Sequence, residues 1–139
     1  MKALLLMFIS VLAFPVSSMQ EINLEGTWGI IECVNGNPEG SQKVLEAEIK
    51  NGTAVCDFYI MKDGKFKQTS NMGDHSDNPK MSTQEGTWKL AGDKLIVSIT
   101  YEGKVYDIDY TCEYKDERLV LTRKSPDGKF FIINTFRKK

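Results

Sequence analysis

The chain contains little histidine, cysteine or proline, and it carries no excess of either charge. Its 139 residues include one His, three Cys and four Pro, with 18 Lys and Arg against 19 Asp and Glu. A balanced charge gives no basic surface for a nucleic-acid backbone, so we expect no nucleic-acid partner. No CxxC pair occurs, and a lone histidine, His75, among loop carboxylates does not make a typical metal site. We therefore expect no metal and no cofactor.

The sequence also lacks the motifs of the common enzyme classes. It has no Gly-x-Ser-x-Gly nucleophile elbow and no phosphate-binding glycine loop. Asp107, Asp109 and Glu113 alternate along one segment, but paired carboxylates act as acid–base groups only in a cleft that shifts their pKa values. On the outer face of a strand such residues add solubility. We therefore expect no catalytic residue and no enzymatic activity.

The one long apolar run lies at the N-terminus. Lys2 precedes an apolar segment from Ala3 to Val16, and Ser17 and Ser18 are small residues that follow it. This order is typical of a secretory signal peptide; the alternative is a membrane anchor, for which the run is short of the roughly 20 apolar residues of a span. We predict cleavage near Ser18, a single domain over 19–139 with no membrane span, and a secreted or periplasmic location.

The rest of the chain alternates short segments of period two with turns that contain Gly or Asp. Such segments are typical of β-strands, and no long amphipathic helix is indicated after Val16. The Asn51-Gly52 pair favours a type I′ hairpin turn. The expected strands are 27–34, 44–50, 54–60, 65–70, 84–90, 94–101, 104–114, 118–124 and 130–137.

Tight turns make consecutive strands antiparallel, and many strands at this spacing favour a closed barrel or a sandwich. The alternation places Leu45, Ala47 and Ile49 on one face and Glu46 and Glu48 on the other, which indicates a sheet with one buried and one wet face. A barrel of about eight strands is just wide enough to be filled by side chains or to hold one small ligand. We predict an all-β fold, an antiparallel up-and-down meander β-barrel of about eight to ten strands.

The tetrapeptide Glu-Gly-Thr-Trp occurs at 25–28 and again at 85–88. The first copy resembles the Gly-x-Trp start of the lipocalin and fatty-acid-binding (calycin) superfamily. The segment from Gly86 to Val97 is similar to small bacterial lipocalin-like domains, many of them secreted. The resemblance covers most of residues 22–139 and implies a lipocalin-like barrel.

The resemblance also implies a structural pair at the base of the barrel. In the superfamily a basic residue on the last strand packs over the first-strand tryptophan, and the matching residues here are Arg137 and Trp28. The chain departs from the fatty-acid-binding proteins in two ways. The segment 35–43 is too short for their helix-turn-helix, and no Arg-x-Tyr carboxylate site lies near the C-terminus.

The candidate ligand-binding residues are the aromatic side chains that strand alternation turns inward. They offer apolar walls and a few hydroxyls that would orient a ligand, although aromatic side chains of this kind also dominate ordinary cores. These candidates are Phe58, Phe66, Trp88, Tyr101, Tyr106 and Tyr110.

The three cysteines leave disulfide pairing open. Cys56 and Cys112 fall on apolar faces and can pair if their strands meet. Cys33 falls opposite Trp28 by parity, so we expect it to face outward.

Two functions follow from these observations. The first is an exported barrel that binds or sequesters a small, mainly apolar molecule through its open end. The second is a filled barrel that acts as a protein-interaction or inhibitor module and uses its loops to bind a partner protein. The two differ in how much room the barrel interior leaves.

Overall fold

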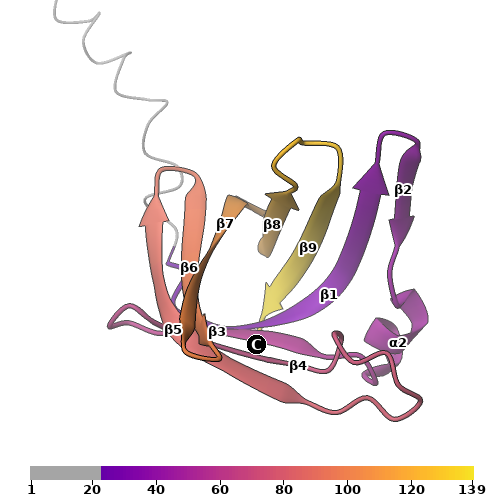
Figure 1. Cartoon of the computed structure of the whole chain (residues 1–139), viewed down its shortest axis with the longest axis horizontal. Helices are drawn as coiled ribbons and strands as arrows, with labels where there is room; N and C mark the ends of the chain where they lie inside the picture. Colours follow the sequence, from indigo (N-terminus) through magenta and orange to yellow (C-terminus); the bar gives the residue numbers. More distant parts are fainter. Residues whose placement is uncertain (1–22) are drawn as a thin grey trace, which may run out of the picture.

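The fold is a single antiparallel sheet that closes on itself (Figure 1). The computed structural model describes residues 23–139, so the predicted signal peptide over 1–18 lies outside the described residues. Along the chain the elements are β1 (Gly26–Asn37), β2 (Gly40–Lys43), α2 (Glu46–Asn51), β3 (Cys56–Ile60), β4 (Lys65–Ser70), β5 (Ser82–Ala91), β6 (Lys94–Tyr101), β7 (Lys104–Lys115), β8 (Arg118–Lys124) and β9 (Phe131–Lys138).

Eight of these strands form the barrel. Each strand from β3 to β8 pairs with the next one along the chain, β1 pairs with β3, and β9 returns to pair with β1. The ninth strand, β2, adds a hairpin to the outer end of β1. The predicted up-and-down barrel is therefore confirmed. Within residues 23–139 no helix is long and apolar enough to cross a membrane.

The segment 44–50, which was expected to be a strand, is helical instead. Helix α2 spans Glu46–Asn51, and Gly52 caps its C-terminus with a φ of 84°. The acidic residues Glu46 and Glu48 lie in its first turn and Lys50 in its last. At these positions their charges interact favourably with the helix dipole. The alternation over 45–49 was too short to distinguish a strand from a helix. Asn51-Gly52 therefore ends a helix and does not form a hairpin.

A bulge in β1 reverses the parity on which Cys33 was assigned to the outside. The register with β9 shifts between Ile30, which pairs with Phe136, and Glu32, which pairs with Thr135. A bulge inserts one extra residue on one strand, so residues beyond it change face. Cys33 is consequently buried, and its predicted outward position was wrong.

The end of the barrel that carries the β3–β4, β5–β6 and β7–β8 turns is packed solid. Trp28 is 1% exposed and donates its indole Nε1–H to the carbonyl of Leu24 at 2.8 Å. Its ring meets Tyr114 edge-on, with the centroids 6.3 Å apart. The side chains that are almost fully buried in this core include Phe58, Ile60, Phe66, Leu95, Leu119, Leu121 and Phe136.

The basic side chain over Trp28 is Lys138, one residue after the predicted Arg137. The Lys138 ammonium lies 5.5 Å from the indole centroid, because Lys138 is the direct partner of Trp28 across β1 and β9. Arg137 pairs with Gly29 and points to the other face of the sheet. The predicted cation–π contact with Trp28 is present, but the residue that makes it is Lys138 and not Arg137.

We expect Lys138→Ala to lower the free energy of unfolding by about 0.5–1 kcal/mol, because it removes the cation from the Trp28 ring. Arg137→Ala is the matched control and should change it by less than about 0.5 kcal/mol. Urea unfolding followed by tryptophan fluorescence measures both. A larger loss in the Arg137 variant would contradict the assignment.

Candidate functional site

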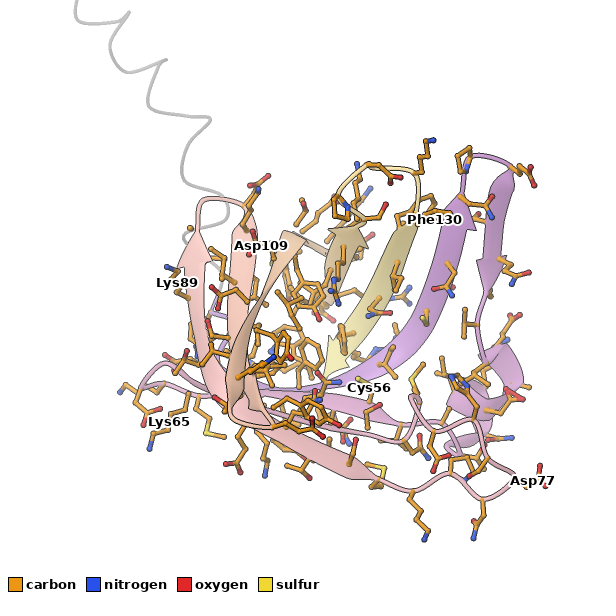
Figure 2. All side chains as sticks on the ribbon, viewed as in Figure 1. Cys56, Lys65, Asp77, Lys89, Asp109 and Phe130 are labelled. Atoms are coloured by element: carbon orange, nitrogen blue, oxygen red, sulfur yellow. The ribbon has the colours of Figure 1, made fainter. Side chains whose placement is uncertain are left out.

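The opposite end of the barrel is open. It is bordered by the β2–α2 segment, the long loop between β4 and β5, the β6–β7 turn and the β8–β9 loop. Asp77 and Phe130 mark two of these loops in Figure 2. A cavity of about 1040 Å³ lies at this end, between the long loop, the start of β5 and the end of β6. Its volume lies just above the usual range for small-molecule sites, about 300–1,000 Å³.

The cavity lies where two neighbouring strands separate. The ladder between β5 and β6 runs from Ala91 and Lys94 to Gly86 and Ile99 and stops there, although β5 begins at Ser82 and β6 continues to Tyr101. On its other side, β5 stays paired with β4 along this stretch. The β7–β8 ladder also stops at Thr111 and Thr122, so the β6–β7 hairpin leans away from both of its neighbours.

Gly86 is the residue of β5 at which the ladder with β6 ends. A Cβ built on Gly86 would lie 1.7 Å from the Ser98 carbonyl oxygen and 2.8 Å from its carbonyl carbon. The two backbones therefore approach here more closely than any side chain allows. Gly86 fixes where β5 and β6 touch and hence where they diverge.

The inner wall of the cavity is polar. Three of its lining residues, Ser70 on β4 and Ser82 and Gln84 on β5, share by pairing register the face of the sheet that carries Phe66. Thr100 on β6 closes the other side of the cavity. Hydroxyl and amide groups thus replace the apolar side chains that fill the closed end.

The long loop that borders the cavity is held by its own polar side chains. Asn71 accepts a hydrogen bond from the Val55 amide and donates one to the Thr53 carbonyl, both at 2.8 Å. The Asp74 carboxylate accepts the amides of Ser76 at 2.9 Å and Lys80 at 2.8 Å. These backbone donors hold the pKa of Asp74 below its usual value. Together these bonds give the loop a defined shape.

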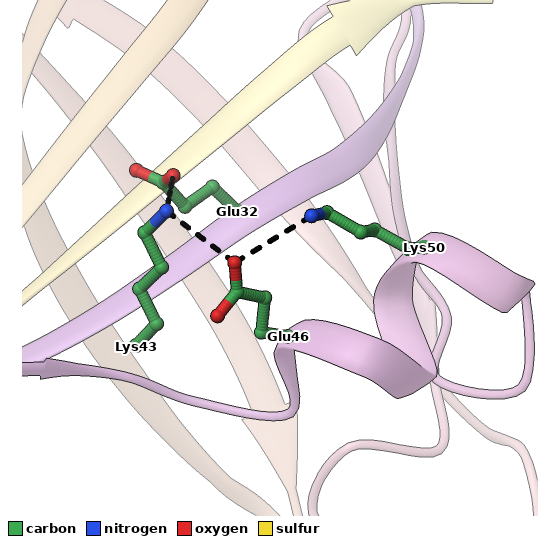
Figure 3. A network of polar contacts seen from close by, with 4 residues as sticks. All are labelled: Glu32, Lys43, Glu46 and Lys50. Atoms are coloured by element: carbon green, nitrogen blue, oxygen red, sulfur yellow. Dashed lines mark ion pairs between the residues drawn. The ribbon is translucent and has the colours of Figure 1, made fainter.

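On the opposite side of the open end, an ion-pair network connects β1, β2 and α2 (Figure 3). Lys43 on β2 lies 3.4 Å from Glu32 on β1 and 3.5 Å from Glu46 on α2, and Lys50 lies 3.6 Å from the same Glu46. Both carboxylates raise the pKa of Lys43. Exposed ion pairs contribute little stability each, so the network mainly orients α2 against β1.

The predicted ligand-binding aromatics occupy three different environments. Phe58, Phe66 and Tyr110 lie in the core, where Phe58 packs edge-on against Phe66 with the ring centroids 5.1 Å apart. Trp88 is half-buried and donates its indole N–H to the Met61 carbonyl at 2.8 Å. The structure therefore gives these four residues packing positions.

The other two predicted residues, Tyr101 and Tyr106, are 54% and 49% exposed on the β6–β7 hairpin. Of the six, only Tyr101 is among the residues that line the cavity. The polar residues of the site were missed. A sequence signal for them was present, because Ser82-Thr83-Gln84-Glu85 is a strand segment with no apolar residue on either face.

The thiols and one amide lie deeper in the barrel. Cys33, Cys56 and Cys112 are buried and unpaired in the structure, and Cys33 is the direct partner of Asn134. The Asn134 Oδ1 atom is the buried side-chain oxygen without a hydrogen-bond partner among the described residues. Over residues 23–139, no three His, Cys, Asp or Glu side chains come together in a way that could hold a metal ion.

We expect the thiols of the folded protein to react slowly with iodoacetamide at pH 8. Burial raises the pKa of Cys56 to about 12 and that of Cys112 to about 11, and it also raises the pKa of Cys33. The reactive thiolate is therefore scarce at pH 8. Mass spectrometry should count three alkylations only after unfolding in urea. Fast alkylation of the folded protein would contradict this burial.

We also expect Gly86→Ala to destabilise the barrel by about 1–3 kcal/mol, because a methyl group cannot fit against the Ser98 backbone. Gly73→Ala is the control, since a Cβ there meets nothing within 4 Å, and it should change stability by less than about 0.5 kcal/mol. Urea unfolding curves decide between the two. Equal stability of both variants would show that β5 and β6 do not meet at Gly86.

Comparisons with known proteins agree with this architecture. A family model described as a lipocalin-like domain matches residues 24–121. A lipocalin-like protein from Bacteroides uniformis has a similar structure, with a TM-score of 0.52, 17% sequence identity, and coverage of 84% of this chain and 98% of that one. An uncharacterized protein from Bacteroides eggerthii gives a TM-score of 0.51, 15% identity, and coverage of 84% and 100%.

The wild-type fluorescent protein UnaG gives a TM-score of 0.43 at 16% identity, over 84% of this chain and 97% of that one. A search of curated protein sequences found no match. The family match spans well over half of the chain and the fold agrees with it. This chain therefore belongs to the lipocalin-like domain family, a class of β-barrels whose members are typically binding proteins and not enzymes.

Proposed function

We propose that the protein is an exported, non-enzymatic barrel that binds a small ligand in the cavity at its open end. The observation that carries the proposal is the contrast between the two ends. One end is filled by buried aromatic and aliphatic side chains, and the other holds a cavity of about 1040 Å³ bordered by ordered loops.

Export rests on the N-terminal pattern of Lys2, the apolar segment and the small residues at Ser17 and Ser18. We place the mature protein outside the cytoplasm on this ground. The proposed ligand makes more polar contacts than the sequence indicated, because most of the side chains around the cavity are hydroxyl, amide or charged groups.

A second candidate function, binding of a partner protein, is favoured by one specific observation. Large hydrophobic side chains are exposed around the open end, and exposed apolar surface often marks an interaction site. Those on the loops, helix and hairpins that border this end are Leu45, Met81, Tyr101, Val105, Tyr106, Phe130 and Ile132. A partner that docks on this rim would cover the mouth of the cavity.

Native mass spectrometry of the protein purified from a secreting host tests the main proposal. We expect a defined non-covalent mass that is lost on denaturation, together with an N-terminus at Met19. An intact N-terminus would contradict export. A bare protein mass that stays bare after incubation with pools of small molecules would contradict ligand binding and favour the partner-protein function.

A further inference from the structure

The cavity at the open end is bordered by two walls of different chemistry. One wall is the inner face of β4 and β5, which presents Ser70, Ser82 and Gln84 to the cavity. The other belongs to the β6–β7 hairpin and presents the ring of Tyr101. A ligand in the cavity therefore meets hydroxyl and amide groups on one side and an aromatic ring on the other.

The pairing register places two tyrosines on the inner face of the β6–β7 hairpin. Side chains two residues apart on a strand share a face, so Tyr101 lies on the face of the buried Ile99. Tyr106 is the direct partner of Ile99 and points the same way. Both tyrosines are nevertheless exposed, whereas Tyr110, on the same face and deeper in the barrel, is buried. The rings of Tyr101 and Tyr106 are thus left accessible to a ligand at the open end.

The polar wall consists of neutral groups. A hydroxyl or a side-chain amide both donates and accepts hydrogen bonds. The Ser82 hydroxyl donates to the Ser70 carbonyl at 3.2 Å, which leaves its oxygen as an acceptor. Gln84 is half-buried between two exposed neighbours, as expected for a side chain on the inner face. This wall is complementary to ligand groups that also both donate and accept, and hydroxyls are the simplest of these.

The charged residues around the cavity give no preference for an ionic ligand. Lys80 and Glu85 carry opposite charges, and both are exposed. The Asp74 carboxylate already accepts the amides of Ser76 and Lys80 within its own loop. A neutral ligand is therefore the better match.

The two walls together favour one class of neutral ligand. A sugar ring has C–H groups that stack on an aromatic face, and the hydroxyls around its edge both donate and accept hydrogen bonds. A fatty acid would leave the hydroxyls and the amide of the β4–β5 wall without partners, which is costly wherever water is excluded. A flat nucleobase stacks well between two rings, whereas this cavity has aromatic rings on one side and polar groups on the other.

We propose that the ligand is a neutral saccharide that stacks on Tyr101 and forms hydrogen bonds with Gln84 and Ser82 through its hydroxyls. This inference rests on the proposed function and deepens it by naming the class of ligand. The cavity of about 1040 Å³ exceeds the usual range for small-molecule sites, so it has room for more than one ring. We therefore expect a disaccharide or a longer chain.

The first experiment uses the unaltered mature protein. Native mass spectrometry with separate pools of neutral di- and trisaccharides, fatty acids and nucleosides identifies the class that binds, and titration calorimetry gives its Kd. For a saccharide that binds, saturation-transfer NMR with irradiation of the aromatic protons should transfer most magnetisation to C–H protons on one face of a sugar ring.

Protein variants locate the site. Tyr101→Ala removes the stacking ring and should weaken saccharide binding by about tenfold. The matched control is Tyr59→Ala, because the Tyr59 ring lies under the Lys67 ammonium and away from the cavity, and it should leave the Kd unchanged.

Gln84→Leu replaces the amide by an apolar group of similar size and should also weaken saccharide binding by about tenfold. Urea unfolding curves of all three variants check that each one folds. A variant that does not fold is set aside, and the saturation-transfer result on the unaltered protein then decides the stacking.

The possible results separate this inference from the proposed function. Saccharide binding that is weakened by Tyr101→Ala and Gln84→Leu, and not by Tyr59→Ala, would support it. Saccharide binding that both cavity variants leave unchanged would overturn the assigned site. Binding of fatty acids or nucleosides, with no saccharide bound, would overturn the saccharide class and leave ligand binding intact. Binding of no pool at all would overturn both.

Discussion

The pairing of β9 with β1 is the interaction on which the rest of the structure depends, because it turns a meander of hairpins into a closed barrel. The ladder runs on either side of the β1 bulge, from Trp28 and Lys138 to Gly36 and Phe131. Lys139 extends it, since its amide donates to the Thr27 carbonyl at 2.8 Å and its ammonium lies 3.0 Å from Asp57 on β3. Closure removes exposed sheet edges, which would otherwise invite aggregation, and encloses one interior that the sequence must fill.

That interior is filled unevenly, and the proposed function rests on this difference between its two ends. At the closed end a Trp and several Phe, Leu and Ile side chains leave no room for a ligand. At the open end the inward positions on β4 and β5 carry amides and hydroxyls, and the β6–β7 hairpin bends away from the strands beside it. A closed barrel has no free edge in principle. This one has a short free edge where the hairpin leaves it, and the cavity lies at that edge.

The sequence predicted the strands well because each one carries its own signal. The β4, β6 and β8 boundaries follow directly from the alternation and from the Gly and Asp turns beside them. The sequence did not predict features that depend on how one strand pairs with another, such as a bulge or a register. The bulge after Ile30 moved Cys33 inside, and a shift of one residue gave the Trp28 contact to Lys138 instead of Arg137.

The site itself was harder to predict than the fold for a physical reason. Aromatic residues on an inward face were the natural candidates, but burial is what such residues achieve best, and Phe58 and Phe66 went into the core. The cavity formed where the inward residues were too polar to pack, at Ser82 and Gln84. In a small barrel, the strand segments without an apolar face are therefore better guides to the ligand site than the aromatic ones.

The repeated Glu-Gly-Thr-Trp motif has the same anchoring contact in both copies but a different position within its strand. Both indoles donate to a main-chain carbonyl at 2.8 Å, Trp28 to Leu24 and Trp88 to Met61, and so fasten a strand at the closed end. A glycine lies two residues before each Trp. β1 begins at the first of these, Gly26, whereas Gly86 is preceded in β5 by four residues. Those four residues, 82–85, are the ones that extend past the end of the β5–β6 ladder. The second copy of the motif thus contains both the Trp88 side chain that anchors β5 to the Met61 carbonyl and the glycine at which the β5–β6 ladder ends.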